Sequence, residues 1–254
     1  MKIVIIGAGN VATQLALRLS ASKHKVVQII SKNISHAKIL ANQVDAEASD
    51  QLSEMYPNSD LILISVNDQS IETVVNKIKP TKAIVVHTSG STSIDILEKF
   101  QNKGVFYPFQ TFSKDKNVEW KTTPILIESG DEVVRNTLFS LADELSNEVV
   151  TANSERRLLM HISAVFACNF TNHLYTLSFK LLEEKGINPN LLLPLISETT
   201  DKLKYLSPFN SQTGPALRND NIILSKHLDY LKNNHEVKVI YQLLSESIQN
   251  LHRK

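Results

Sequence analysis

Two glycines near the start of this chain stand between an apolar run and an amphipathic segment. Lys2–Ile6 forms the run, and apolar residues recur at helical spacing from Val11 to Leu19. Between them, Gly7, Gly9 and Ala12 make a Gly-x-Gly-x-x-Ala pattern. In this pattern the first glycine permits a tight turn, the second admits a pyrophosphate to the backbone, and the alanine keeps helix and strand close. A dinucleotide-binding strand, turn and helix is therefore predicted; the alternative is a glycine turn in an unrelated α/β protein.

Apolar runs continue to alternate with amphipathic segments up to about residue 152. Helices are predicted at Ile34–Val44, Gln69–Ile78 and Asp131–Leu145. Further strands are predicted at Val26–Ile30, Leu61–Val66, Ala83–Val86, Val105–Tyr107, Thr123–Glu128 and Glu148–Thr151. This alternation is typical of a mostly parallel sheet with helices on both faces. We therefore expect an α/β fold with a doubly wound Rossmann sheet.

The pattern changes after Ala152, where amphipathic segments continue without a convincing strand. The first segment, from about Ser154 to Glu184, is long for a globular helix and closes at Lys185–Gly186. Later helices are predicted from Pro189, over Asp220–Lys232 and over Glu236–Leu251. We expect a dinucleotide-binding domain over residues 1–152 and an all-α domain for substrate binding and dimerisation over residues 153–254.

Charge balance and cysteine content argue against several classes of function. The 27 Lys and Arg residues against 26 Asp and Glu leave a formal net charge of +1, which gives no field to attract nucleic acid or acidic lipid. The single cysteine, Cys168, cannot form an internal disulfide, and no Cys/His cluster has metal-ligand spacing. The first residues also lack the long apolar core and cleavage site of a secretory signal. We expect a cytoplasmic protein with no metal and no nucleic-acid partner.

The most apolar long stretch of the chain, Leu158 to Phe179, is not expected to cross a membrane. It contains His161, Asn169, Asn172 and His173, whose polar groups are costly at membrane depth. A helix of a soluble protein is the better interpretation.

The second predicted strand ends without the acidic residue that usually binds the adenine ribose of NAD. Ser31, Lys32 and Asn33 follow it, and a hydroxyl beside a lysine offers a donor and a positive charge to a 2′-phosphate. NADP is therefore predicted over NAD, unless Lys32 is only a solvated loop lysine. The predicted cofactor-binding residues are Gly7, Gly9, Asn10, Val11, Ala12, Ser31, Lys32, Val66, Asn67 and Ser89.

Five blocks carry a resemblance over essentially the full chain: GAGNVATQLA at the start, HTSGST at 87–92, FYPFQTFSK at 106–114, HISAVFACNFTNHLY at 161–175 and TGPALRND at 213–220. With these blocks the chain resembles a family of predicted NADP oxidoreductases with a C-terminal helical domain of unknown function 2520. Ketopantoate reductase, pyrroline-5-carboxylate reductase and prephenate dehydrogenase are wider relatives. The resemblance implies a cleft between domains and a homodimer formed through helices, and it does not supply a substrate.

Polar residues at the carboxyl ends of the predicted strands are candidates for the site, because ligands of open α/β sheets bind at that edge. Ser89 and Gly90 are expected at the nicotinamide or the substrate, and His87 is more simply a hydrogen-bonded strand-end residue. Asp68, after Asn67, is expected to cap the next helix. Further along the chain, Gln110 and Thr111 are candidate substrate contacts in the loop that Tyr107 begins, whose aromatic residues are alternatively core packing.

The long helix carries the predicted proton donor. Asn169 and His173 are four residues apart and share a face, and His161 lies on the same stripe two turns earlier. We expect His173 to donate the proton and Asn169 to orient the substrate across a cleft between the domains that the Ser89 loop completes. The alternative is that both hydrogen-bond across a helix or dimer interface. Arg218 is expected to bind a substrate carboxylate or a phosphate, with a structural salt bridge as its alternative.

These features predict an NADP-dependent reductase or dehydrogenase that acts on a small, anionic carbonyl or imine compound. The related dehydrogenases often carry a lysine, histidine or asparagine on the long helix beside the nicotinamide. Because no lysine matches here, the alternative is a dinucleotide-binding sensor or scaffold without catalytic activity.

Overall fold

The computed structural model describes residues 1–253, which form two compact units that divide between Cys168 and Asn169. The predicted boundary after residue 152 lies between the last strand and the helix that follows it. The two compact units instead meet farther along the helical segment that begins at Ser154.

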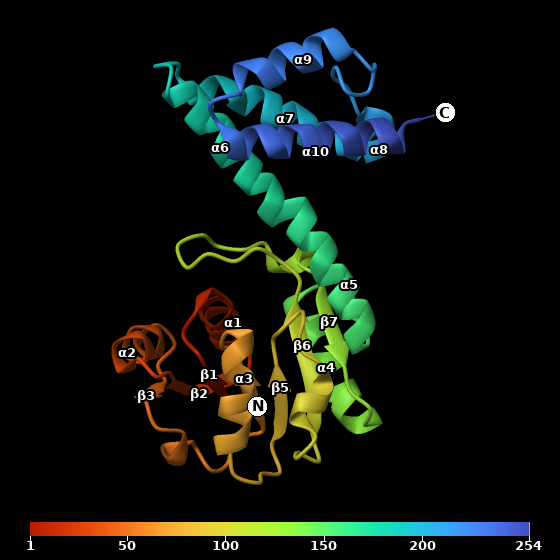
Figure 1. Ribbon diagram of the computed structural model, residues 1–254. Coiled ribbons are helices and arrows are strands. Elements are labelled where there is room, and N and C mark those ends of the chain that lie inside the picture. The colour runs from red at the N-terminus through yellow and green to blue at the C-terminus, as the bar shows by residue number, and fades with distance from the viewer. Residues whose placement is uncertain (254) are drawn as a thin grey trace. The chain divides into compact units, whose positions relative to one another are not determined.

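The first unit is built on an eight-stranded sheet in the order β3-β2-β1-β4-β5-β6-β7-β8 (Figure 1). All neighbouring strands are parallel except β6 and β7. The strands are β1 (Lys2–Ile6), β2 (Lys25–Ile30), β3 (Glu47–Ser49), β4 (Leu61–Ile64), β5 (Ile84–His87), β6 (Lys103–Pro108), β7 (Ile125–Glu128) and β8 (Val149–Thr151). The predicted α/β fold with a mostly parallel Rossmann sheet is confirmed.

Helices cover both faces of this sheet, and each face has its own apolar core. On one face the core includes residues of α1 (Asn10–Ser20), α2 (Ile34–Gln43) and α4 (Glu132–Leu145). On the other it includes residues of α3 (Asp68–Lys77). Burial on both faces explains why strands such as β4, with the sequence LILI, are continuously apolar.

One strand of the sheet has no counterpart among the predicted strands. β3 is three residues long and lies at the edge of the sheet, and its Glu47 is exposed. It carries no apolar run because it packs little surface. Periodicity therefore could not reveal it.

The predicted long helix is one helical run with a change of winding in its middle. α5 (Ser154–Ala164) is followed by a π-helical segment, Val165–Phe170, and then by α6 (Thr171–Glu183). Gly186 follows the run with φ +69°, in the left-handed region expected for a helix-ending glycine. The contact-based division of the chain falls inside the π-helical segment.

The second unit has no strand within residues 169–253. Besides α6 it contains α7 (Leu193–Asp201), α8 (Pro208–Ser211), α9 (Asn221–Tyr230) and α10 (His235–Leu251), and a 3-10 turn at Pro189–Leu192 leads into α7. Within this unit's described residues, the buried apolar residues are Ala216, Leu224 and Leu231. Among the helices of residues 1–253, none combines the length and apolar character needed to cross a membrane.

Candidate cofactor-binding and active site

The turn between β1 and α1 is shaped by two glycines with different surroundings. Gly7 has φ +123°, and a Cβ there would overlap the carbonyl oxygen of Ser65 at the end of β4. Gly9, in contrast, has open space where a Cβ would lie. α1 begins after Gly9 with no side-chain cap and no acidic residue in its first turn. The amides and the positive end of the helix dipole are therefore accessible to an anion, which fits a cofactor pyrophosphate.

The end of β2 is cationic rather than acidic. Lys32 is exposed, and residues 31–36 contain no carboxylate. Asn33 caps α2, because its Oδ1 accepts hydrogen bonds from the amides of Ser35 at 3.0 Å and His36 at 3.3 Å. The cap leaves Lys32 as the cation at the start of this helix. The arrangement fits a 2′-phosphate and lacks the carboxylate that usually accepts hydrogen bonds from the ribose hydroxyls of NAD.

The loop after β6 is held against α1. Asn10 Nδ2 donates to the carbonyl oxygen of Phe112 at 2.9 Å, and Gln14 Nε2 donates to the carbonyl oxygen of Ser113 at 2.8 Å. Gln110 and Thr111 lie in this loop with exposed side chains. These two predicted substrate contacts therefore belong to a loop that is anchored beside the glycine turn.

A line of contacts connects the glycine turn with the end of β5. Gly7 packs against Ser65, whose Oγ accepts a hydrogen bond from Thr88 Oγ1 at 3.1 Å. The amide of Thr88 in turn donates to the carbonyl oxygen of Ile64 at 3.1 Å. The predicted cofactor residues Val66 and Asn67 follow directly on β4. The carboxyl ends of β1, β4 and β5 thus form one continuous edge.

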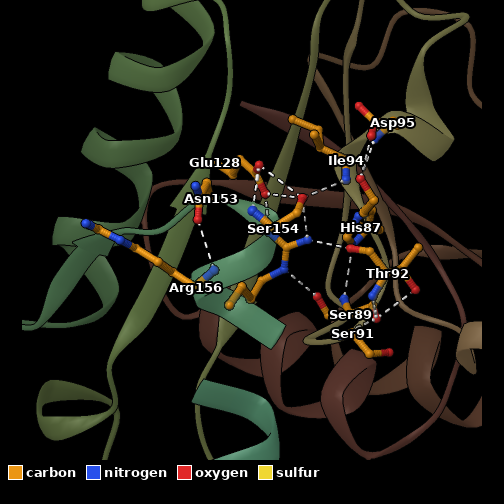
Figure 2. A network of polar contacts seen from close by, with 12 residues as sticks. His87, Ser89, Ser91, Thr92, Ile94, Asp95, Glu128, Asn153, Ser154 and Arg156 are labelled. Carbon is orange, nitrogen blue, oxygen red and sulfur yellow. Dashed lines mark hydrogen bonds and ion pairs between the residues drawn. The ribbon is translucent and has the colours of Figure 1, made fainter. Parts of the chain in front are cut away.

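Beyond Thr88, residues 89–92 form a tight turn, drawn in Figure 2, which we call the Ser89 turn. Ser89 Oγ accepts from the amides of Ser91 at 3.2 Å and Thr92 at 3.0 Å, and it donates to Thr92 Oγ1 at 2.9 Å. The Ser91 hydroxyl donates to the carboxylate of Asp68. Asp68 is the first residue of α3 and accepts from Ser91, so its expected capping role is wrong. The hydroxyl of Ser89 holds the shape of the turn, and its catalytic role stays a prediction.

Arg157 of α5, which was not singled out from the sequence, fixes this turn from behind. Its side chain is 1% exposed, and it forms an ion pair with Glu128 at the end of β7. Its Nε donates to the carbonyl oxygen of Ser89 at 3.1 Å, and one Nη donates to that of Thr92. Figure 2 shows Glu128 and Ser154 converging on this network from β7 and α5. A buried arginine needs such partners, but its partners Glu128, Ser89 and Thr92 lie far from Arg157 in sequence.

His87, the last residue of β5, lies buried under the Ser89 turn. Its Nδ1 accepts a hydrogen bond from the Ser89 amide at 3.2 Å, and within residues 1–253 its Nε2 has no hydrogen-bond partner. Burial, and then the positive charge of Arg157, lowers the pKa of His87 to about 4. His87 is therefore neutral near pH 7, as suits a residue that supports the turn.

A tyrosine and a histidine meet on the other side of the turn. Tyr107 Oη and His161 Nδ1 are 3.1 Å apart, and the two rings meet edge to face with centroids 6.2 Å apart. A Cβ on Gly90 would lie 2.7 Å from His161 Nδ1 and 2.8 Å from Tyr107 Oη. Burial raises the pKa of Tyr107, and the negative charge of Asp68 adds to this effect, so the phenol keeps its proton.

The other predicted site residues belong to the second unit. Asn169 lies in the π-helical segment, His173 in α6 and Arg218 in the turn before α9, and all three side chains are exposed. Their catalytic and substrate-binding roles stay predictions. Within residues 1–253, no group of three or more His, Cys, Asp or Glu side chains is placed to hold a metal ion.

Comparison with known proteins identifies the family. Residues 2–90 match the family described as NADP oxidoreductase, coenzyme F420-dependent, and residues 123–248 match the domain of unknown function DUF2520. The crystal structure of a candidate NADP oxidoreductase from Bacteroides fragilis is 39% identical, with a TM-score of 0.91 over 98% of both chains. The chain belongs to this family of NADP oxidoreductases with a DUF2520 domain. We call its members DUF2520 oxidoreductases, and their cofactor is NADP.

The chain is also similar to two reductases. A reductive aminase from Aspergillus terreus, in complex with NADPH and ethyl-5-oxohexanoate, has a TM-score of 0.74. It covers 99% of this chain and 94% of the other, and at 14% identity the likeness shows the fold alone. Pyrroline-5-carboxylate reductase from Aquifex aeolicus is 26% identical over 103 residues, which is 41% of this chain and 39% of that protein. The match to this curated relative thus spans about two fifths of its length.

Proposed function

We propose that this DUF2520 oxidoreductase uses NADPH to reduce a small imine or carbonyl compound. The observation that carries the proposal is the N-terminus of α1, which has no side-chain cap, no acidic residue in its first turn and open space at Gly9. From this turn the carboxyl edge of the sheet leads through Ser65 and Thr88 to the Ser89 turn. NADPH, when bound, supplies a hydride. The chain supplies amides for the pyrophosphate, the Lys32 cation for the 2′-phosphate, and a rigid edge beside the nicotinamide.

We infer an imine as the preferred substrate class and a carboxylate as its charged group. The named relatives support the first point, since one reduces pyrroline-5-carboxylate and another is a reductive aminase. Arg218 is our proposed partner for the carboxylate, because a guanidinium can bind both of its oxygens. Gln110 and Thr111, on the loop beside α1, are proposed to hydrogen-bond to the substrate.

We also propose a homodimer formed through the second unit. Residues 169–253 bury few apolar side chains, and the unit exposes many others. The exposed ones include Leu191, Leu195, Leu203, Phe209, Ile222, Tyr230, Val239, Leu243 and Leu244. A helical unit of this size needs a larger core, and a second copy of the same surface would provide it.

The proposal is tested by mixing the protein with NADPH and one of three compounds: 1-pyrroline-5-carboxylate, ethyl 5-oxohexanoate with ammonia, or pyruvate. We expect NADPH absorbance to fall fastest with the cyclic imine, and we expect Gly9→Val to abolish this loss. Tight binding of NADPH without turnover of any of the three would favour a dinucleotide-binding sensor or scaffold. Failure to bind NADPH would overturn both functions.

A further inference from the structure

The Tyr107–His161 pair lies entirely within the first unit, so its position at the sheet edge is defined. Tyr107 comes from β6 and His161 from α5, and both side chains are half-buried. Their contact at 3.1 Å joins a phenol to an imidazole. Half-burial holds the rings in place while leaving surface available to a ligand.

The backbone of the Ser89 turn lies directly against the pair. A side chain at Gly90 would displace it, since the Cβ would lie 2.7 Å from His161 Nδ1. This turn is joined to the glycine turn through Thr88 and Ser65. A dinucleotide whose pyrophosphate binds at α1 extends its nicotinamide along this edge. The glycine at position 90 therefore brings the two rings to the place where the reacting carbon is expected.

Other polar groups at this edge already have partners or lack a usable proton. His87 is neutral and accepts the Ser89 amide hydrogen bond. The Ser89 hydroxyl is engaged inside the turn, and Arg157 is paired with Glu128. His161, in contrast, has only one of its two ring nitrogens directed at Tyr107.

We propose that His161 is the catalytic acid of this site and that Tyr107 positions its ring. The inference rests on the proposed NADPH-dependent reduction. The hydride leaves NADPH with both electrons of its C–H bond and forms a new C–H bond at the imine or carbonyl carbon. The proton on Nε2 of the protonated His161 passes to the substrate nitrogen or oxygen. NADP⁺ and neutral His161 remain, and solvent returns the proton to His161.

Tyr107 fixes the orientation and the protonation pattern of His161. When the imidazole is protonated, Nδ1–H donates to the phenol oxygen and Nε2 carries the second proton. After the Nε2 proton has passed to the substrate, the neutral ring keeps Nδ1–H and its hydrogen bond to the phenol oxygen, and solvent reprotonates Nε2. In both states Nε2 is the atom that exchanges a proton with the substrate.

The test measures the dissociation constants of NADP⁺ and NADPH by titration calorimetry between pH 5.5 and 8.5. A protonated His161 repels the positive nicotinamide of NADP⁺ but not the neutral one of NADPH. The ratio of the NADP⁺ to the NADPH constant should fall about tenfold as pH rises through this range. Titration of the 2′-phosphate is common to both forms and cancels. The other charged or titratable side chains around the turn are Asp68 of α3, Glu128 of β7, Arg157 of α5 and His87 of β5, and the pKa of His87 is lowered to about 4.

His161→Asn should make the ratio independent of pH while both cofactor forms still bind, and His161→Gln serves if the asparagine variant does not fold. Tyr107→Phe should retain the transition with a shifted midpoint, a change that loss of packing alone would not produce. The matched control is His227→Asn, which breaks a second tyrosine–histidine pair, His227 Nδ1 with Tyr241 Oη at 2.7 Å. The control should keep the transition of the unmodified protein.

Two outcomes separate the proposals. If neither cofactor form binds, the proposed function fails. If both bind and the ratio does not change with pH, or if it still changes in His161→Asn and stops changing in His173→Asn, His161 is not the catalytic acid and the proposed function stands.

Discussion

Gly7 and Gly9 lie two positions apart, and a glycine is needed at each for a different physical reason. Gly7 is required by the fold, because of its positive φ and its contact with Ser65. Gly9 has an ordinary φ of −82° and open space around its missing Cβ. Its role is to leave room for a ligand, and the protein's own packing does not need it.

The two positions should therefore respond differently to substitution. Gly7→Ala should lower the free energy of unfolding by about 2 kcal/mol or more, because both the backbone strain and the overlap with Ser65 must be relieved. Gly9→Val should leave the melting temperature nearly unchanged and abolish NADPH binding. Thermal denaturation and calorimetry measure both effects. NADPH binding by a folded Gly9→Val protein would remove the pyrophosphate from this turn.

Lys32→Ala should weaken NADPH binding about tenfold, because a charge-assisted contact with the 2′-phosphate is lost. NADH carries no such phosphate, and its affinity should not change. Lys82→Ala removes an exposed lysine just before β5, away from the carboxyl edge, and serves as the control. Equal losses of affinity for NADH and NADPH would show that Lys32 does not bind the 2′-phosphate.

His87 should make the fold sensitive to acid. Its pKa is about 4 in the folded protein against an ordinary value of 6.5, so the unfolded chain takes up this proton first as pH falls. Stability should therefore decline from about pH 6.5 to pH 4 by about 3 kcal/mol and then level off with respect to this group. Urea denaturation across this range measures the slope. His87→Gln, which cannot titrate, should flatten it; an unchanged slope would assign the effect to other groups.

At the scale of elements, apolar periodicity predicted the strands from β1 to β8 except β3, whose three residues bury too little surface to leave a pattern. It predicted α5 and α6 as one helix, and the π-helical winding at Val165–Phe170 has no signature in residue spacing. The glycine turn was predicted because the residues that bind a pyrophosphate there lie close together in the sequence. The Ser89 turn was only partly predicted, because the side chains that pack against it belong to β6, β7 and α5, which lie far from it in the sequence.

Arg157 shows why such a site escapes sequence reasoning and offers its own test. Arg157→Met should lower the free energy of unfolding by about 3–5 kcal/mol, because Glu128 is left charged and mostly buried without its partner. The double variant with Glu128→Gln should recover part of this loss. Chemical denaturation of the two single variants and the double variant measures the coupling. Strictly additive losses would mean that the ion pair does not stabilise the turn.

At the scale of the whole molecule, the apolar surface of the second unit predicts a stability that depends on protein concentration. Leu243→Glu on α10 should place a charge in the proposed interface, yield monomers in size-exclusion chromatography with light scattering, and lower the melting temperature. Val133→Glu alters a comparably exposed apolar residue of the first unit and should leave the dimer intact. A monomeric unmodified protein would refute the interface.

The buried ion pair between Arg157 and Glu128 fixes the first turns of α5 to the sheet. His161 lies on the same helix as Arg157 and is therefore also held against the sheet, whereas the chain beyond the π-helical segment belongs to the other unit. Chimeras joined at Val165–Phe170 should therefore keep the coenzyme preference and acid group of the parent that donates the sheet. Their choice of substrate should follow the parent that donates the later helices, so the two traits could be inherited and engineered separately.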